Sequence, residues 1–142
     1  MRASAALAAT TAELAFRPAL GRFATGVTLI TAPGGESLVV NAFMSVSLDP
    51  PLVAFGAGRS SLTWRRMRRS EHLGINMLDS SIDDAHGVPR LAQATAFLLA
   101  EVLDERAVGD HALVTCAVLE AEYDESRRPL VFFAGAFGSF AA

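Results

Sequence analysis

The sequence has little of what metal or disulfide chemistry requires. Its 142 residues include a single cysteine, Cys116, so no disulfide can form within the chain. The three histidines, His72, His86 and His111, do not have the spacing of metal ligands, and no cluster of Cys or carboxylate side chains completes such a site. Cys116 lies in an apolar run without a basic neighbour, which favours a buried structural thiol over a nucleophile. We therefore expect no metal and no thiol chemistry.

The sequence also lacks the charge and the hydrophobic runs that direct a chain to nucleic acid or to a membrane. Its 12 basic and 15 acidic residues give a net charge of −3, so no positive field attracts a nucleic acid. No apolar run approaches the roughly 20 residues of a membrane-spanning helix. The alanine-rich residues 1–13 are too weakly hydrophobic for a secretory signal. They predict a flexible arm, followed by one domain over 14–142, in a cytoplasmic protein.

The motifs of hydrolases and of common phosphate loops are missing too. Residues 56–58, with the sequence GAG, lack the further glycine and the lysine of such loops, and no Gly-x-Ser-x-Gly elbow occurs. Asp79, Asp83 and Asp84 lie in a polar connection, which indicates a solvated loop rather than a paired acid and base. Hydrolytic chemistry is therefore disfavoured.

Apolar residues arranged as short strands are what the sequence does contain. Hydrophobic residues make up 51% of the chain and charged residues 19%, a balance that predicts a real core and a surface hidden in a dimer. Residues 92–103 suit either a helix or a buried strand. Many short strands with few helices favour a mainly β fold, a barrel closed on itself. Strands are predicted at 27–31, 37–40, 52–55, 73–78, 112–119 and 129–133, with a turn at 33–35 joining the first two.

Two short helices complete the prediction. Apolar residues at intervals of three and four predict an amphipathic helix over 16–23, with Pro18 in its first turn and Gly26 as its stop. A second helix over 62–69 follows a serine pair that can cap it. Four of its last five residues are arginines. In an acidic chain this favours a solvated helix face, with a phosphate clamp as the alternative.

The stretch NAFMSVSLDPP, residues 41–51, is unusually polar for a core strand. It places Asn41, Ser45 and Ser47 close together among apolar residues and ends at two prolines. An ordinary strand with alternating faces and a turn at the prolines is one interpretation. The other is a strand that grips a flat polar ligand with these side chains and with backbone N–H groups.

Six segments together resemble the short-chain flavin reductases. These are FMN-binding split-barrel proteins that supply reduced flavin to two-component monooxygenases. The order and spacing of the segments cover residues 16 to about 137, and the combination is specific although each piece alone is weak. The segments are FRPALGRFATGVT (16–28), NAFMSVSLDPPLV (41–53), RSSLTW (59–64), GINML (74–78), GDH (109–111) and FFAGAF (132–137).

The resemblance implies a fold, a reaction and a set of site residues. It implies a mainly β, FMN-binding split β-barrel with a few short helices, a homodimer with flavin between subunits, and a partner flavin-dependent monooxygenase. The reaction would be that of an NAD(P)H:flavin oxidoreductase, with FMN or FAD reduced by NADH or NADPH. His111 would be the catalytic residue, beside the docked nicotinamide. The implied flavin-binding residues are Val39, Val40, Asn41, Ala42, Ser45, Val46, Ser47, Arg59, Ser60, Ser61 and Trp64.

The sequence departs from the family pattern in a way that keeps an alternative open. Val39 stands where a threonine is common, and Phe137 where an aromatic residue often carries a hydroxyl. The connection over 79–90 is much shorter than in relatives, which have there a helix and a segment that helps to cover the flavin. A non-catalytic flavin-binding or structural dimer on the same barrel is therefore the alternative to the reductase.

Overall fold

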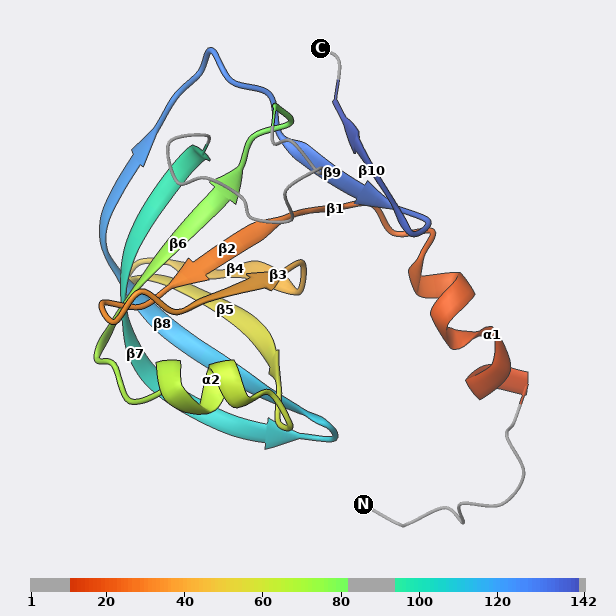
Figure 1. Ribbon diagram of the computed structural model, residues 1–142, viewed down its shortest axis with the longest axis horizontal. Coiled ribbons are helices and arrows are strands. Elements are labelled where there is room, and N and C mark those ends of the chain that lie inside the picture. The colour runs from red at the N-terminus through yellow and green to blue at the C-terminus, as the bar shows by residue number, and fades with distance from the viewer. Residues whose placement is uncertain (1–10, 82–93, 141–142) are drawn as a thin grey trace.

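The computed structural model describes residues 11–81 and 94–140, most of which belong to two antiparallel sheets (Figure 1). The larger sheet has seven strands in the order β3-β2-β6-β7-β8-β5-β4, and the smaller has three in the order β1-β9-β10. The large sheet consists of β2 (Thr28–Thr31), β3 (Ser37–Val40), β4 (Phe43–Leu48), β5 (Pro51–Gly58), β6 (His72–Leu78), β7 (Ala94–Val108) and β8 (His111–Tyr123). The small sheet consists of β1 (Thr25–Gly26), β9 (Leu130–Phe133) and β10 (Ala136–Ser139), and the helices are α1 (Thr11–Leu20) and α2 (Leu62–Met67).

The large sheet curls around one hydrophobic core (Figure 1). Side chains of a strand alternate between its two faces, so every second residue points inward. On β5 these are Val53, Phe55 and Ala57, and on the neighbouring β8 they are Val114 and Cys116, all buried in the same cluster. Strands β3 and β4 are the two edges, and among the described residues they do not pair with each other. The sheet is thus a split barrel, and the expectation of a fully closed barrel is wrong.

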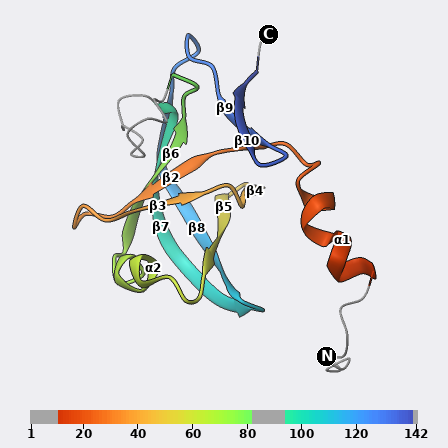
Figure 2. The same ribbon diagram turned by 45° about the vertical axis from the view of Figure 1, so that its right-hand side comes forward.

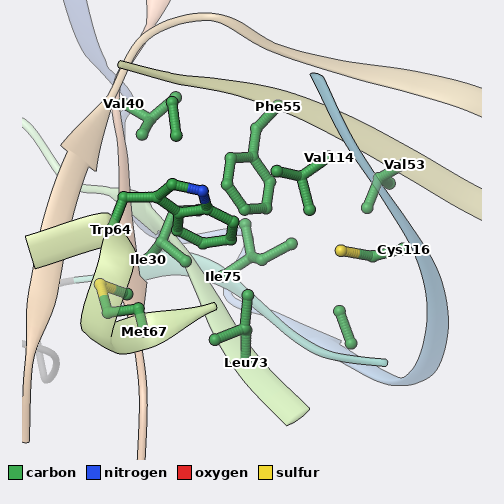
Figure 3. Close-up of a cluster of buried hydrophobic side chains, with 12 residues drawn as sticks. Ile30, Val40, Val53, Phe55, Trp64, Met67, Leu73, Ile75, Val114 and Cys116 are labelled. Carbon is green, nitrogen blue, oxygen red and sulfur yellow. The ribbon is translucent and has the colours of Figure 1, made fainter. Parts of the chain in front are cut away.

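Helix α2 packs its apolar side against this core. Trp64 and Met67 are its buried residues, and the Trp64 ring meets Phe55 edge-on with 5.5 Å between ring centroids (Figure 3). The Trp64 Nε1 donates a hydrogen bond of 3.0 Å to Glu105 Oε1 on β7, and Arg68 Nε donates one of 3.1 Å to Glu105 Oε2. The helix is therefore held by apolar packing on one side and by a shared carboxylate on the other.

The small sheet lies beside the split barrel and has its own apolar cluster. Val27, Leu29 and Leu78 are buried, and Leu130 and Phe132 of β9 pack against them. Strand β9 pairs with β1 and β10 rather than with a strand of the large sheet. The strand predicted at 129–133 is therefore present, but it belongs to the small sheet.

Helix α1 stands away from the barrel in both views (Figures 1 and 2) and buries none of its residues. It begins at Thr11, inside the range expected as an arm, while residues 1–10 lie outside the described part. Pro18 falls near the end of the helix rather than in its first turn. The helix ends at Leu20, and Gly26 belongs to β1, so the predicted stop is wrong. The helix is formed by local periodicity, but no residue within 11–81 and 94–140 buries its apolar side.

Other predictions are confirmed or extended. The hairpin of β2 and β3 has the predicted turn, and β7 shows that the ambiguous segment is a strand from Ala94 onward. Strand β5 is longer than predicted, because it continues through residues 56–58 in register with β8. The connection containing Asp83, Asp84 and His86 lies outside the described residues, apart from its first positions. There the prediction of a solvated loop is wrong for Asp79, which is 5% exposed and accepts hydrogen bonds from Ser81 N and Arg127 Nη1.

Candidate functional site

Residues 41–51 form the outer strand of the large sheet and the turn after it. Phe43 packs against the core, as a strand with alternating faces requires. The register with β5 shifts between Ser45 and Ser47, so Val46 is an extra residue in the edge strand. Such a bulge bends an edge strand and re-aims its side chains. The two serines singled out from the sequence therefore flank an irregular and accessible segment.

Of the predicted binding residues between 39 and 47, Val40 is the one that is buried. Val40 is 6% exposed and belongs to the core cluster, and its carbonyl accepts a 2.6 Å hydrogen bond from Thr28 Oγ1. Its side chain therefore offers no surface to a ligand. The residues that are exposed are Val39, Asn41, Ala42, Ser45 and Val46, while Ser47 is half-buried.

His111 lies close to Ala42, although the two are 69 positions apart in the sequence. His111 begins β8, and Ala42 lies just before β4. The residue between them is Gly56 of β5. A Cβ atom built on Gly56 lies 3.5 Å from the Ala42 Cβ and 3.6 Å from the His111 Cδ2. The Gly56 N–H also donates a 2.9 Å hydrogen bond to the Ala42 carbonyl. The fold thus brings two predicted site residues to either side of a position without a side chain.

Gly56 lies on the outer face of the sheet, opposite to the core. Strand register pairs Gly58 with His111 and Gly56 with Leu113, whereas Ala112 lies on the buried face. The outward positions of β5 in this region therefore carry no side chain beyond a hydrogen. Backbone polar groups and exposed side chains surround this floor, as a binding site for a planar molecule requires.

The turn before His111 is joined to the segment before α2. Arg59 N donates to the Asp110 carbonyl and Arg59 Nη1 donates to the Gly109 carbonyl, both at 3.0 Å. Gly109 has φ of 63°, a conformation that favours glycine. His111 Nδ1 lies 2.8 Å from Asp110 Oδ1, and this hydrogen bond, with the charge of His111, lowers the pKa of Asp110. The two loops therefore hold each other and fix both Arg59 and the His111 ring.

The two serines before α2, Ser60 and Ser61, have different roles. Ser61 is the N-cap, and its Oγ accepts a 3.1 Å hydrogen bond from Trp64 N, which confirms the capping prediction. Ser60 is exposed. Trp64 is 2% exposed and lies in the core, apart from the accessible residues. Of this predicted group, the structure therefore presents Arg59 and Ser60 to a ligand.

Cys116 has no place in this site. It is fully buried in the core, and burial raises its thiol pKa to about 11. Because the thiolate is the reactive form, such a thiol is inert near neutral pH. The prediction of a buried structural cysteine is confirmed.

Sequence reasoning missed Gly56 and Glu105. Residues 56–58 do not match a phosphate loop, yet their alternation of Gly, Ala and Gly within a strand is the signal of a face without side chains. Glu105 carries no local signal, because its partners Trp64 and Arg68 are brought to it by the fold.

The described residues also bear on metal binding and on membrane insertion. Within 11–81 and 94–140, no three His, Cys, Asp or Glu side chains are grouped as metal ligands. No helix in the same part of the chain is long and apolar enough to cross a membrane.

Comparison with known proteins identifies a protein family that the chain matches. The family model described as "Flavin reductase like domain" matches residues 20–86 and 79–141. The match divides near residue 80, where the sequence indicated a shortened connection.

Two curated relatives and one solved structure resemble most of the chain. An NADH-dependent flavin reductase of a Rhodococcus species is 34% identical over 151 residues, covering 89% of this chain and 85% of its own. The reductase component of a 4-nitrophenol monooxygenase of Rhodococcus opacus is 32% identical, covering 88% and 80%. The structure of the flavin reductase PheA2 is 31% identical, with a TM-score of 0.80, and covers 92% of this chain and 99% of that one.

Proposed function

This chain belongs to the flavin reductase-like domain family, and from that membership and the site geometry we propose that it is an NADH-dependent flavin reductase. Its product would be reduced FMN or FAD, delivered to a partner flavin-dependent monooxygenase. The observation that carries the proposal is the proximity of Ala42, Gly56 and His111 on the outer face of the sheet. The relative that is named as a monooxygenase component supports the choice of partner.

The residues present fit a flavin ring. An isoalloxazine is flat, with a polar rim and an apolar face, and the bound flavin supplies the hydride-accepting chemistry. Gly56 adds no side chain between Ala42 and His111. Ser47 pairs with Leu52, an outward position of β5, whereas Ser45 pairs with Val53 on the core side of the edge strand. We assign the hydroxyl groups of Ser45 and Ser47 and the amide of Asn41 to the polar rim of the ring. We place Val39, Ala42 and Val46 in the same wall, and Val40 and Trp64 in the core that supports it.

Arg59 and Ser60 are the residues we assign to the flavin phosphate. Arg59 is held by two hydrogen bonds to the loop of Gly109 and Asp110, so its guanidinium is positioned in advance. A guanidinium binds phosphate with charge-assisted hydrogen bonds. Ser61 contributes mainly by capping the six-residue helix that follows.

His111 is assigned to the nicotinamide side. Its Nδ1 is engaged by Asp110, which leaves Nε2 for a ligand group such as the nicotinamide amide. Hydride passes directly between two cofactors, so the task of the protein is to hold the rings at the right distance and angle. The exposed imidazole beside Gly56 is placed for that orientation.

We also propose that the protein is a homodimer and that it is cytoplasmic. The exposed apolar side of α1 supports the dimer, because a large uncovered apolar patch commonly marks an interaction surface. Leu14, Phe16 and Leu20 on α1 are 72%, 61% and 54% exposed, and Phe23 just after it is 74% exposed. The cytoplasmic location stays a prediction from the sequence.

One assay tests the proposed function. Purified protein is mixed with FMN or FAD and with NADH or NADPH, and absorbance at the nicotinamide band is followed. Oxidation of NADH that depends on flavin is the expected result. A protein that binds flavin but oxidises neither nicotinamide would contradict the reductase and support the non-catalytic flavin-binding alternative. Failure to quench FMN fluorescence would contradict both.

A further inference from the structure

The turn between β7 and β8 carries His111 at an exposed end of the barrel. Val108 pairs with His111, so Gly109 and Asp110 alone make the turn. The side chain of Asp110 is 97% exposed and that of His111 is 55% exposed. Exposed hairpin ends with few packing contacts are the parts of a fold that open and move most easily. The His111 ring therefore keeps one orientation only if a contact from outside the hairpin restrains the turn.

Arg59 supplies that contact from the neighbouring strand. It follows Gly58, the last residue of β5, which pairs with His111 beside the turn (Figure 1). The Arg59 N–H donates a 3.0 Å hydrogen bond to the Asp110 carbonyl, and its Nη1 donates one of 3.0 Å to the Gly109 carbonyl. Within 11–81 and 94–140, no other side chain from outside the hairpin bonds to these two turn residues.

The turn transmits this restraint to the imidazole. His111 Nδ1 lies 2.8 Å from Asp110 Oδ1. The direction of the Asp110 carboxylate follows from the backbone of the turn, and Arg59 holds both carbonyls of that backbone. Arg59 therefore acts on the orientation of the His111 ring through Asp110.

The same guanidinium retains donors for a ligand. A guanidinium carries N–H groups on each of its nitrogens in a fixed fork. In the described part of the chain its Nη1 bonds to Gly109, whereas Nε and Nη2 have no protein acceptor. Binding the flavin phosphate and holding the turn are therefore compatible tasks for Arg59.

We propose that Arg59 is a positioning residue for hydride transfer, because it holds the turn of Gly109 and Asp110 and thereby orients His111. This inference rests on the proposed function and deepens it, since it gives Arg59 a task on the nicotinamide side as well as at the flavin phosphate. Removing the side chain should leave the fold intact. The bond to Gly109 is exposed, and the backbone bond to Asp110 remains.

A double-mutant cycle with His111 tests whether Arg59 acts through the imidazole. Flavin reduction is followed by anaerobic stopped flow at saturating FMN and NADH in the wild type, Arg59→Ala, His111→Ala and the double variant. Arg59→Ala should slow reduction by roughly three- to tenfold, because the nicotinamide loses a fixed orienting group. In the His111→Ala background the same change should alter the rate by less than about twofold, since residues that act as one unit are not additive. An equal loss in both backgrounds, or no loss in the wild-type background, would overturn the inference.

Riboflavin separates the turn from the phosphate, because it has the ring of FMN and no phosphate. Arg59→Ala should weaken FMN binding in a fluorescence titration and leave riboflavin binding within about twofold. It should nevertheless slow the reduction of both flavins by a similar factor. Slower reduction confined to FMN would assign Arg59 to the phosphate alone and overturn the inference.

Arg69→Ala is the matched control. It removes the same charge from an exposed position after α2, and in the described residues the Arg69 side chain does not bond to the turn. Its reduction rate should stay within about twofold of the wild type. A wild type that oxidises no NADH with any flavin would contradict the proposed function. An active wild type with an equally active Arg59→Ala variant would contradict only the positioning role.

Discussion

At the scale of residues, the candidate site depends on one imidazole and on the glycine next to it. Gly56 brings Ala42 and His111 within contact distance of the same empty position. Asp110 fixes one nitrogen of the imidazole. The ring therefore has a defined orientation before any ligand arrives, which is what an orienting group needs.

Replacing His111 by alanine tests this role. We expect His111→Ala to slow hydride transfer by roughly ten- to a hundredfold, because the nicotinamide loses an orienting contact. The flavin dissociation constant should change little. Anaerobic stopped-flow measurement of flavin reduction and fluorescence titration of flavin give the two quantities separately. Equal losses in both would refute the assignment, and Asp110→Asn serves as a control for the integrity of the turn.

The site residues that sequence reasoning found are those with a local signature. Asn41, Ser45 and Ser47 were recognisable because polar residues are rare in such a strand, and Ser61 because a serine before a helical run is a typical cap. Gly56 could be assigned only after strand register showed which face it occupies and that His111 lies beside it. Contacts between distant strands have no local signal.

At the scale of elements, the placement of α2 depends on Glu105. The helix has six residues, too few to be stable by itself. Its Trp64 is buried, and the indole N–H finds its acceptor on β7, 41 positions later in the chain. The carboxylate that accepts this bond also pairs with Arg68, so a single side chain fixes both the middle and the end of the helix.

A pair of substitutions separates the two contacts of Glu105. Glu105→Ala should reduce the free energy of unfolding by about 1–3 kcal/mol, since it leaves the buried indole N–H without an acceptor. Glu105→Gln keeps an acceptor for the indole and loses only the exposed ion pair, so the loss should stay below about 1 kcal/mol. Urea denaturation followed by the fluorescence of the single tryptophan measures both. Equal losses would mean that the ion pair, not the indole bond, dominates.

The elements predicted wrongly were those whose boundaries are set by distant partners. Gly26 looked like a helix stop, but it pairs with Val131 of β9 and so belongs to a strand. The strand at 129–133 was predicted, but its apolar residues fit either sheet and did not show that it pairs with β1 and β10. By contrast, β2, β3 and β6 were predicted from β-branched residues and turn residues that need no distant partner to be recognised.

At the scale of the whole molecule, the open question is what covers the apolar surface of α1. The helix buries none of its residues and stands apart from the barrel (Figure 2). The high hydrophobic content of the sequence already predicted a surface hidden in a dimer, and the structure supplies a specific region for it. A second copy of the chain is the partner we propose.

Replacing Phe16 by serine tests this surface. Phe16 is 61% exposed, so the change should cost the isolated chain little stability but should remove much of the apolar contact in a dimer. Light scattering after gel filtration should show a dimer for the wild type and a shift toward monomer for Phe16→Ser. Tyr123→Ser, at a position 76% exposed at the end of β8, should stay dimeric. A wild type that is monomeric at all concentrations would contradict the proposal.

The single cysteine makes it possible to measure how often the barrel opens. Cys116 lies fully buried at the centre of β8, which has β5 on one side and β7 on the other. A thiol reagent can reach it only when these strands separate, so the labelling rate under native conditions counts openings of the barrel. Measured with and without a bound ligand, that rate would report how far ligand binding slows the opening, with no residue changed.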